Sequence, residues 1–180
     1  KFELGYSLNQ WDQLTKTAIN KGYSESMLEK SGLLIKKEDG KKYDRFRGRV
    51  IFPVHNLSGK VIAFGARILT KEKDQPKYIN SPETDIYHKS HVLYGLFQAR
   101  NAIRRDDFCY LVEGYRDVIS LHQSDIENVV ACSGTALTED QIMPAYGLDE
   151  EYELVTSSTP AMLAALGDAI DKKEPIVVTM

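Results

Sequence analysis

The sequence predicts two folds in succession: an α+β part containing an antiparallel hairpin, then an α/β part containing a parallel sheet. Two apolar runs, at residues 50–54 and 61–69, flank a Ser58-Gly59 turn and predict the hairpin. Further on, the order of strands and helices from residue 110 predicts parallel strands with right-handed crossovers. The chain has 180 residues and 42% apolar content, enough for one domain or two small ones.

The first 35 residues predict two short helices and a strand. Ser7 and Gln10 have the spacing of a capping box, and a helical pattern follows until Gly22. Ser24 then predicts the start of a shorter helix that ends at Gly32, and residues 33–35 predict a short strand. We assign no chemistry to these elements.

Three alternating arginines stand at the entry to the hairpin. On one continuous strand, Arg45, Arg47 and Arg49 would point to the same face and form a stripe of guanidinium groups that binds phosphate. A charged strand facing solvent explains the same pattern equally well. The returning strand adds Arg67, and its Gly65 suggests a bulge or the close approach of another backbone.

A polar stretch at residues 71–90 predicts a long loop, which is unusual in a compact domain unless it has a function. Lys77, Tyr78, Asn80 and Lys89 combine cations, an aromatic ring and an amide, and this combination suits a template strand or an incoming nucleotide. His88 has no Cys or His partner nearby in the sequence, so we expect it to be exposed. Residues 93–103 predict a helix with a basic end.

Two carboxylates follow the central strand of the second part. The strand at residues 110–112 ends at Glu113, Gly114 releases the backbone, and a helix begins that carries Asp117 in its first turn. Two such carboxylates suit Mg²⁺, which usually accepts one or two protein oxygens plus substrate phosphates. The alternative is that the acidic residues only complement the dipole of the helix.

Further alternation of strands and helices continues to the end of the chain. We expect strands at residues 128–132, 152–156 and 175–179, and a helix at 160–171. Cys109 and Cys132 have no paired spacing, which predicts buried thiols in a reducing compartment and no zinc site. No apolar run is long enough to cross a bilayer. Both ends read like the interior of a longer protein.

The net charge of −3 conceals a strong asymmetry. Residues 36–105 contain sixteen basic and seven acidic groups, whereas residues 106–180 contain three basic and fifteen acidic groups. A polymerase-like site would need cations for the nucleic-acid backbone and carboxylates for metal ions. Two solvated faces of opposite charge would give the same counts.

Six blocks of this sequence resemble the RNA polymerase core of a bacterial replicative DNA primase. They occur in the family's order and lie within residues 1–142: YDRFRGRVIFP (43–53), VIAFGAR (61–67), PKYINSPET (76–84), LYGL (93–96), VEGYRDV (112–118) and SGTALT (133–138). The resemblance implies a basic N-terminal subdomain at 1–105 and a toprim-like α/β subdomain at 106–180.

The resemblance also implies an activity, the synthesis of RNA primers on single-stranded DNA from nucleoside triphosphates with Mg²⁺ or Mn²⁺. Glu113 would be the toprim glutamate, with Asp117 as the acid beside it. The family's basic cleft, which holds template DNA, an RNA–DNA hybrid or nucleotide, would include Arg45, Arg47, Arg67, Lys77 and Lys89. The implied partner is a replicative helicase, and the implied location is the cytoplasm.

The sequence departs from the family near its end. A toprim domain carries an Asp-x-Asp pair after its third strand, but residues 156–161 read Thr-Ser-Ser-Thr-Pro-Ala and contain no carboxylate. From about residue 146 the chain instead resembles the C-terminal lobe of a glycine betaine or related osmoprotectant-binding protein. We therefore expect a hybrid chain with impaired catalysis.

Two alternative functions remain open. One is a nucleic-acid-binding module without catalysis. The other is an osmoprotectant-binding protein, whose aromatic cage would have only Tyr146 and Tyr152 to draw on in the tail.

Overall fold

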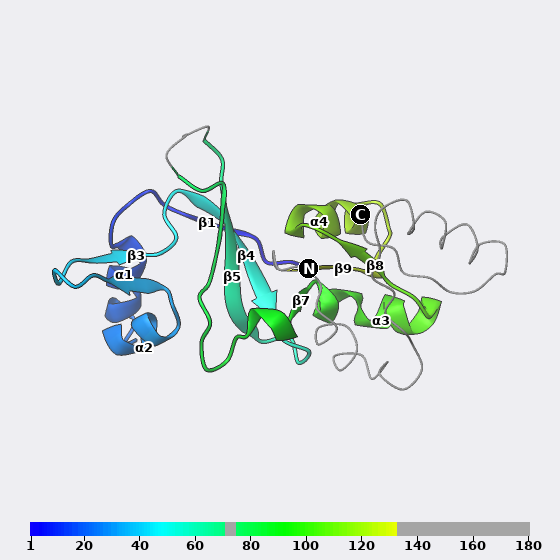
Figure 1. Cartoon of the computed structure of the whole chain (residues 1–180), viewed down its shortest axis with the longest axis horizontal. Coiled ribbons are helices and arrows are strands. Elements are labelled where there is room, and N and C mark those ends of the chain that lie inside the picture. Colours follow the sequence, from blue (N-terminus) through cyan, green and yellow to red (C-terminus); the bar gives the residue numbers. More distant parts are fainter. Residues whose placement is uncertain (71–74, 133–180) are drawn as a thin grey trace. The chain divides into compact units, whose positions relative to one another are not determined.

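The computed structural model describes residues 1–70 and 75–132, which form two compact units (Figure 1). The first unit holds Lys1–His55 and Lys60–His88, and the second holds Asn56–Gly59 with the described residues from Lys89 onward. The units divide at residues 88 and 89, whereas the expected boundary followed residue 105. The predicted elements at residues 152–156, 160–171 and 175–179 lie outside the described residues.

A four-stranded antiparallel sheet forms the centre of the first unit. Its strands, in spatial order, are β1 (Gly5–Ser7), β4 (Arg49–His55), β5 (Val61–Ile68) and β6 (Tyr78–Asn80). The β4–β5 pair confirms the predicted hairpin. Its inward residues are well covered: Val54 is fully buried and Ala66 is 1% exposed.

The irregularity in this hairpin is not at the predicted position. Gly65 pairs in regular register with Phe52 on β4 and with Asn80 on β6, so the expected bulge at this glycine is wrong. The register instead shifts between Val54 and His55, close to the turn. Gly65 lies on a strand that is paired on both sides.

The long loop predicted at residues 71–90 is partly structured. Its middle forms β6, which pairs with β5, and Thr84 makes an isolated bridge with Tyr87. Ser81 anchors the segment because its backbone N–H donates to the Phe64 carbonyl at 2.8 Å and its Oγ accepts from the Phe64 N–H at 3.0 Å. The pairing depends on β5, a strand distant in sequence, which explains why local composition did not predict it.

Two short helices and a small hairpin complete the first unit. They are α1 (Gln13–Asn20), α2 (Glu25–Lys30), β2 (Leu34–Lys36) and β3 (Lys42–Asp44). Ala18, Leu28 and Leu34 share a buried cluster among these elements. The Ser24 hydroxyl accepts from the Met27 N–H, which confirms the predicted start of the second helix.

The first helix begins later than the sequence suggested. Ser7 lies in β1, where its hydroxyl donates to the Phe46 carbonyl, so the predicted capping box is wrong. The start of α1 is capped instead by Asp44, at the end of β3. The Asp44 carboxylate accepts from the Leu14 N–H at 2.7 Å and from the Thr15 N–H and hydroxyl at 3.1 and 2.6 Å.

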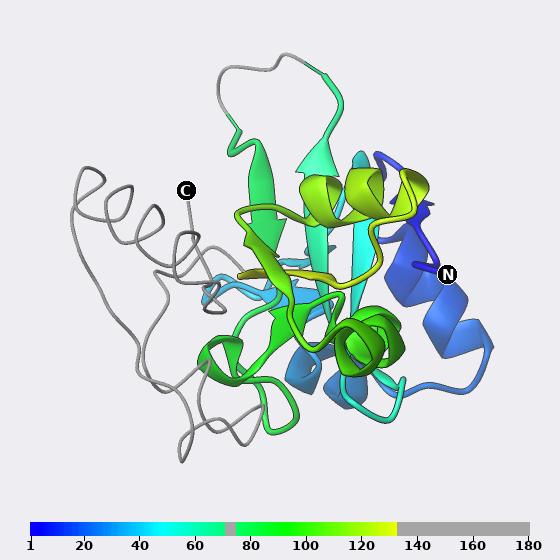
Figure 2. The same cartoon turned by 90° about the vertical axis from the view of Figure 1, so that its right-hand side faces the viewer.

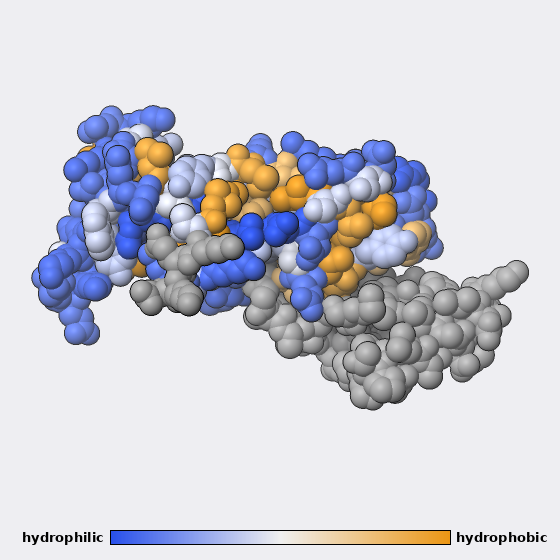
Figure 3. Space-filling model, turned by 90° about the horizontal axis from the view of Figure 1, so that it is seen from above, coloured by the Kyte–Doolittle hydropathy of each residue, from blue (hydrophilic) through white to orange (hydrophobic). Residues whose placement is uncertain are grey.

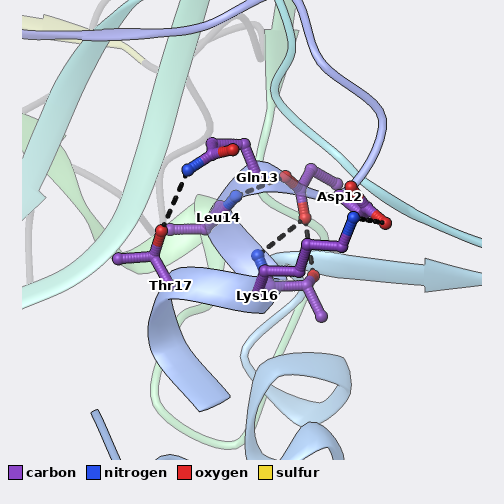
Figure 4. A network of polar contacts seen from close by, with 7 residues as sticks. Asp12, Gln13, Leu14, Lys16 and Thr17 are labelled. Atoms are coloured by element: carbon purple, nitrogen blue, oxygen red, sulfur yellow. Dashed lines mark hydrogen bonds and ion pairs between the residues drawn. The ribbon is translucent and has the colours of Figure 1, made fainter. Parts of the chain in front are cut away.

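Exposed side chains add two weaker contacts around the same helix start (Figure 4). Lys16 pairs with Asp12 at 3.0 Å, and Gln13 donates to the Thr17 hydroxyl at 3.3 Å. Surface pairs of this kind contribute little to stability. Asp44 is 2% exposed, so its hydrogen bonds matter more for the position of α1.

A three-stranded sheet forms the second unit. Its elements are η1 (Lys89–His91), β7 (Leu93–Tyr94), α3 (Leu96–Asp106), β8 (Tyr110–Val112), α4 (Tyr115–Gln123) and β9 (Val129–Cys132). The parallel β8–β9 pair with α4 between its strands confirms the predicted β-α-β unit. Figures 1 and 2 show α3 and α4 on opposite sides of this sheet, as in a doubly wound fold.

The packing of the second unit explains why it begins before residue 106. Leu93 and Ala99, from β7 and α3, share a buried cluster with Leu111, Val130 and Cys132. The β4–β5 turn also belongs to this unit, because Arg100 of α3 donates to the Leu57 carbonyl at 2.9 Å. The β7 strand, antiparallel to β9, was not predicted; the sequence suggested that this stretch was the start of the helix.

No helix in the described parts of the chain is both long enough and apolar enough to span a bilayer. The face of the described residues in Figure 3 shows hydrophilic and hydrophobic side chains interspersed.

Candidate functional site

The three alternating arginines do not lie on one strand. β3 ends at Asp44 and β4 begins at Arg49, and the residues between them are irregular. Gly48 has a φ of 61°, a left-handed conformation that interrupts the extended backbone. The predicted stripe on a single strand face is therefore wrong, and each arginine has its own surroundings.

Arg45 is bound within the protein. Its Nε donates to the Gly32 carbonyl at 2.6 Å, and burial lowers the pKa of its guanidinium group. Gly32 has a φ of 69°, and a Cβ at this position would lie 2.5 Å from the ring of Pro82. Arg45 therefore holds the turn that follows α2, and Gly32 in this turn packs tightly against Pro82.

Arg47 lies against two aromatic rings. Its guanidinium carbon is 4.4 Å from the centroid of the Trp11 ring and 4.7 Å from that of Tyr43, and the two rings meet edge to face at 5.9 Å. Nη1 of Arg47 also donates to the Asp44 carbonyl at 3.0 Å. We call this group the Trp11–Arg47–Tyr43 stack. Trp11 is 68% exposed, so much of its indole surface is accessible.

Sequence reasoning missed Trp11 and Tyr43 as candidate binding residues. Trp11 fitted the apolar pattern of the first predicted helix, whereas the structure places it before α1 begins. The signal that could have identified it was a large aromatic residue that is separated from an arginine-rich segment by two helices and a hairpin. Such pairing across more than thirty residues is not visible in local periodicity.

Arg67, Lys77 and Tyr78 are brought together by the β5–β6 pair. Arg67 is opposite Tyr78 in the register, and the Arg67 guanidinium carbon and the Lys77 Nζ each lie 5.8 Å from the centroid of the Tyr78 ring. We call this group the Arg67–Lys77–Tyr78 cluster. Within residues 1–70 and 75–132, neither cation has an acidic partner, and Arg67 Nε is buried without a hydrogen-bond acceptor. Adjacent cations without a carboxylate favour an anionic ligand.

Asn80, His88 and Lys89 lie along the same segment but differ in position. Asn80 is at the end of β6 and half-buried, whereas Lys89 begins η1 in the second unit. His88 is exposed, as predicted, and its Nδ1 lies 3.2 Å from a Glu83 carboxylate oxygen. The structure therefore joins Arg67, Lys77 and Tyr78 in one cluster, while Lys89 belongs to the other compact unit.

The two predicted carboxylates stand at the end of β8. Glu113 is exposed directly after the strand, and Asp117 is exposed in the first turn of α4. Val118, which is fully buried, and Tyr115, which is 7% exposed, fix this helix against the unit's core. Asp117 Oδ2 accepts a hydrogen bond from the Gly114 N–H at 3.1 Å. One of its oxygens therefore caps the N-terminus of α4, in line with the alternative that the acidic residues complement the helix dipole.

The donor chemistry at this strand end fits a hard divalent cation. Exposed carboxylate oxygens from Glu113 and Asp117 are the ligand type that Mg²⁺ and Mn²⁺ prefer. In the part of the chain that the structure describes, no group of three or more His, Cys, Asp or Glu side chains could hold a metal ion. At this strand end, the described residues offer such a cation the carboxylates of Glu113 and Asp117.

The cysteines and the tyrosine pair of the second unit have a structural role. Cys109 and Cys132 are free thiols, and burial raises the pKa of both, which keeps them protonated. Burial, and then the proximity of Tyr115, raises the pKa of Tyr94, whose ring centroid lies 4.3 Å from that of Tyr115. Cys132 lies in β9 and Tyr94 in β7, and the two thiols stay protonated at neutral pH.

Comparison with known protein families covers nearly the whole chain. The profile of the DNA primase catalytic core, N-terminal domain, matches residues 1–100, and the profile of the toprim domain matches residues 107–178.

Curated relatives give the same result. The DNA primase of Halalkalibacterium halodurans is 48% identical over 141 residues, which are 78% of this chain and 23% of that protein. The DNA primases of Deinococcus radiodurans and Synechocystis are 48% and 40% identical over 96% and 98% of the chain, which correspond to 31% and 28% of those proteins. The chain thus spans less than a third of the length of these relatives.

Solved structures of primases share the fold. The RNA polymerase domain of Mycobacterium tuberculosis primase, in complex with a double-stranded DNA oligomer with a 6-nucleotide overhang, aligns with a TM-score of 0.78 at 31% identity. This alignment covers 99% of the present chain and 60% of the other. A DNA primase domain from Pseudomonas aeruginosa aligns with a TM-score of 0.72 at 44% identity, over 82% of this chain and 46% of that one.

The comparisons also correct one expectation. The toprim profile continues through residue 178, and the Synechocystis primase aligns over 98% of the chain, so an osmoprotectant-binding origin of residues 146–180 is not supported. The resemblance that suggested it rested on residues 146–180 alone, a much shorter stretch than the six blocks within residues 1–142. The chain belongs to the bacterial DNA primase family and carries sequence of both the N-terminal domain and the toprim domain of the catalytic core.

Proposed function

We propose that this chain is a piece of a primase that takes part in DNA-templated synthesis of RNA primers from nucleoside triphosphates. The Arg67–Lys77–Tyr78 cluster is the observation that carries the proposal. Two cations there have no acidic partner in the described residues, and they flank an aromatic ring that is 45% exposed. Cations bind phosphate and an aromatic ring stacks on a base, so the cluster has both features that a nucleotide or a single strand requires.

The Trp11–Arg47–Tyr43 stack supports contact with a single-stranded template. The Arg47 guanidinium group lies against Trp11 and Tyr43 and keeps the indole in place. Trp11 is 68% exposed, so its indole surface is accessible for stacking with a base of the template. Base–aromatic stacking contributes about 1–3 kcal/mol per base and tolerates any sequence. One solved relative is described as a primase catalytic domain bound to single-stranded DNA, and it is 41% identical over 81% of this chain.

Glu113 and Asp117 are proposed to hold a divalent cation together with the substrate's phosphates. When bound, such an ion neutralises the charge that develops on the phosphates during nucleotidyl transfer. Glu113 contributes an exposed carboxylate after β8. Asp117 keeps the N-terminus of α4 in place through its hydrogen bond to Gly114, and this bond orients the helix turn next to Glu113.

Catalysis by this chain is proposed to be impaired. Residues 156–161, where the resemblance implies an Asp-x-Asp pair, contain no carboxylate and lie outside the described residues. Loss of metal-holding carboxylates removes several kcal/mol of transition-state stabilisation, and each ~1.4 kcal/mol corresponds to a tenfold change in rate. The same observation favours a second candidate function, a module that binds nucleic acid without catalysis.

The family suggests the remaining biology. We propose a single-stranded DNA template, nucleoside triphosphates and an RNA–DNA hybrid as ligands, a replicative helicase as the partner of the full-length protein, and the cytoplasm as its location.

Titration of fluorescent single-stranded DNA tests the binding part of this proposal. We expect the affinity to fall by more than tenfold between about 50 mM and about 200 mM salt, because several phosphates release counterions on binding. The Arg67→Ala/Lys77→Ala double variant should weaken binding and flatten this salt dependence. Binding that is absent, or unaffected by salt, contradicts the proposal.

A primer-synthesis assay separates the two candidate functions. The chain is incubated with template, nucleoside triphosphates and Mg²⁺ or Mn²⁺, and Glu113→Gln serves as the matched variant, since it keeps the shape of the side chain and removes its charge. Weak product that disappears in Glu113→Gln supports an impaired polymerase. DNA binding without product supports the binding module, and strong product shows that residues 156–161 are not needed as a metal site.

A further inference from the structure

Arg49 is the third arginine of the segment that the sequence predicted to bind phosphate, and it is the most buried. It begins β4, pairs in the register with Ile68 of β5, and is 3% exposed. A ligand cannot reach a guanidinium group so completely covered without disruption of the sheet. A buried cation also needs hydrogen-bond acceptors, because an unpaired one is costly to bury.

The acceptors of Arg49 lie in the segment just before β6. Nη1 donates to the Pro76 carbonyl at 2.9 Å and to the Lys77 carbonyl at 3.4 Å, and Nη2 donates to the Gln75 side-chain oxygen at 3.4 Å. A single side chain therefore holds three consecutive residues. The forked guanidinium is suited to this role, since its donors diverge in one plane; an ammonium group cannot reproduce that geometry.

These hydrogen bonds from Arg49 fix the residues that precede β6, which the β5–β6 pairing does not reach. β6 is a short edge strand that pairs with β5 only from Tyr78 to Asn80. The Lys77 carbonyl lies just outside this pairing, and it accepts from the Ile68 N–H at 3.0 Å as well as from Arg49. Without Arg49, the backbone that carries the Lys77 side chain would depend on one hydrogen bond at the end of an edge strand.

We propose that Arg49 is a positioning residue for the Arg67–Lys77–Tyr78 cluster. It holds the Pro76 and Lys77 carbonyls, so that the Lys77 ammonium group and the Tyr78 ring stay beside Arg67. Arg49 itself does not touch the ligand. Its effect on DNA binding rests on the proposed function, whereas its effect on the structure of residues 75–78 does not.

A double-mutant cycle tests the functional half. Single-stranded DNA is titrated into the wild type, Arg49→Lys, Lys77→Ala and the double variant at two salt concentrations. We expect Arg49→Lys to weaken binding by up to about tenfold, close to the effect of Lys77→Ala, and the double variant to lose clearly less affinity than the product of the two single effects. Effects that multiply in the double variant would overturn the proposal, because Arg49 would then act independently of Lys77.

Hydrogen exchange at the backbone amides tests the structural half without a ligand. Arg49→Lys should speed exchange at Lys77–Ile79, while Arg100→Lys, which alters a comparable bond from an arginine to the Leu57 carbonyl, should leave these amides unchanged. Unchanged exchange in Arg49→Lys overturns the proposal. If the wild type binds no DNA, the proposed function fails, and the exchange result still decides whether Arg49 holds this segment.

Thermal unfolding of each variant shows whether it is folded before either test. If Arg49→Lys does not fold, Arg49→Gln, which retains neutral N–H donors, takes its place in both experiments.

Discussion

Two cation-bearing regions of the first unit differ in what their charges bind. In the arginine segment at residues 45–49, Arg45 and Arg49 donate to backbone carbonyls of the protein itself. In the Arg67–Lys77–Tyr78 cluster, two cations share an exposed tyrosine and have no acidic partner among the described residues. Basic side chains thus stabilise the protein itself in one region, whereas in the other we propose that they bind a ligand.

Arg47 shows that the difference follows burial and partners, not position in the sequence. It stands between two structural arginines, yet its guanidinium lies on Trp11, which is largely exposed. The count of basic residues in a segment therefore overestimates the number of phosphates that the segment binds. Substitutions that change stability and DNA affinity separately test this difference between the two regions.

Asp44→Ala, directly before the arginine segment, should have the largest effect, a loss of stability. The substitution removes three hydrogen bonds that a buried carboxylate accepts at the start of α1, so we expect the free energy of unfolding to fall by about 3 kcal/mol. Urea denaturation measures this change. Asp39→Ala is the matched control, because Asp39 is exposed and bonds to its neighbour Lys41. An equal loss in both variants would show that Asp44 does not hold the helix.

Arg67→Ala should affect DNA binding more than stability. Loss of one phosphate contact should weaken single-stranded DNA binding about tenfold and reduce the slope of log affinity against log salt by about one. Lys36→Ala, which removes an exposed charge from β2, is the control and should change affinity by less than about twofold. If the two variants weaken binding equally, only total charge matters and the comparison of regions fails.

Arg45→Lys should show the reverse pattern. The variant keeps the positive charge but loses the Nε donor to the Gly32 carbonyl, so we expect a loss of about 1 kcal/mol in unfolding free energy and little change in DNA affinity. Urea denaturation and DNA titration of the same preparation measure both quantities. A loss of affinity as large as that of Arg67→Ala would place Arg45 among the ligand-binding residues.

The smallest expected effect is on the pH dependence of stability, and it arises from Cys109 in the second unit. Burial raises the pKa of the Cys109 thiol, so its contribution to stability is complete below the ordinary thiol pKa, about 8.5, and is lost as pH rises through the raised value. Wild-type stability should therefore fall slightly more steeply between about pH 8 and pH 10 than that of Cys109→Ala. Parallel pH profiles in urea denaturation would contradict this.

Local patterns predicted several elements correctly. The turn at Ser58-Gly59 between apolar runs gave the β4–β5 hairpin, and the strand ending at Glu113 gave β8, α4 and the parallel β9. In each case neighbouring residues contain the information, because hydrophobic periodicity and turn residues act over a few positions. The family likeness of residues 1–142 was carried by the same local motifs.

Elements that depend on distant partners were not predicted. β6 forms by pairing with β5, and the start of α1 is set by hydrogen bonds to the Asp44 carboxylate. Trp11 contacts Arg47 because the β2–β3 hairpin brings these distant residues together. The expectation of a foreign tail failed for a different reason: a resemblance over residues 146–180 alone is too short to identify a family, and the toprim profile continues through residue 178.

The sequence alone determined which residue types are present and where strands and helices alternate, and so it identified the family and the candidate carboxylates Glu113 and Asp117. The three-dimensional structure separates the arginines whose donors bind carbonyl groups of the protein, such as Arg45 and Arg49, from the cations that we propose to bind a ligand. The reason is physical: a guanidinium group binds a protein carbonyl or a phosphate with the same donors, and its three-dimensional neighbours determine which acceptor it meets.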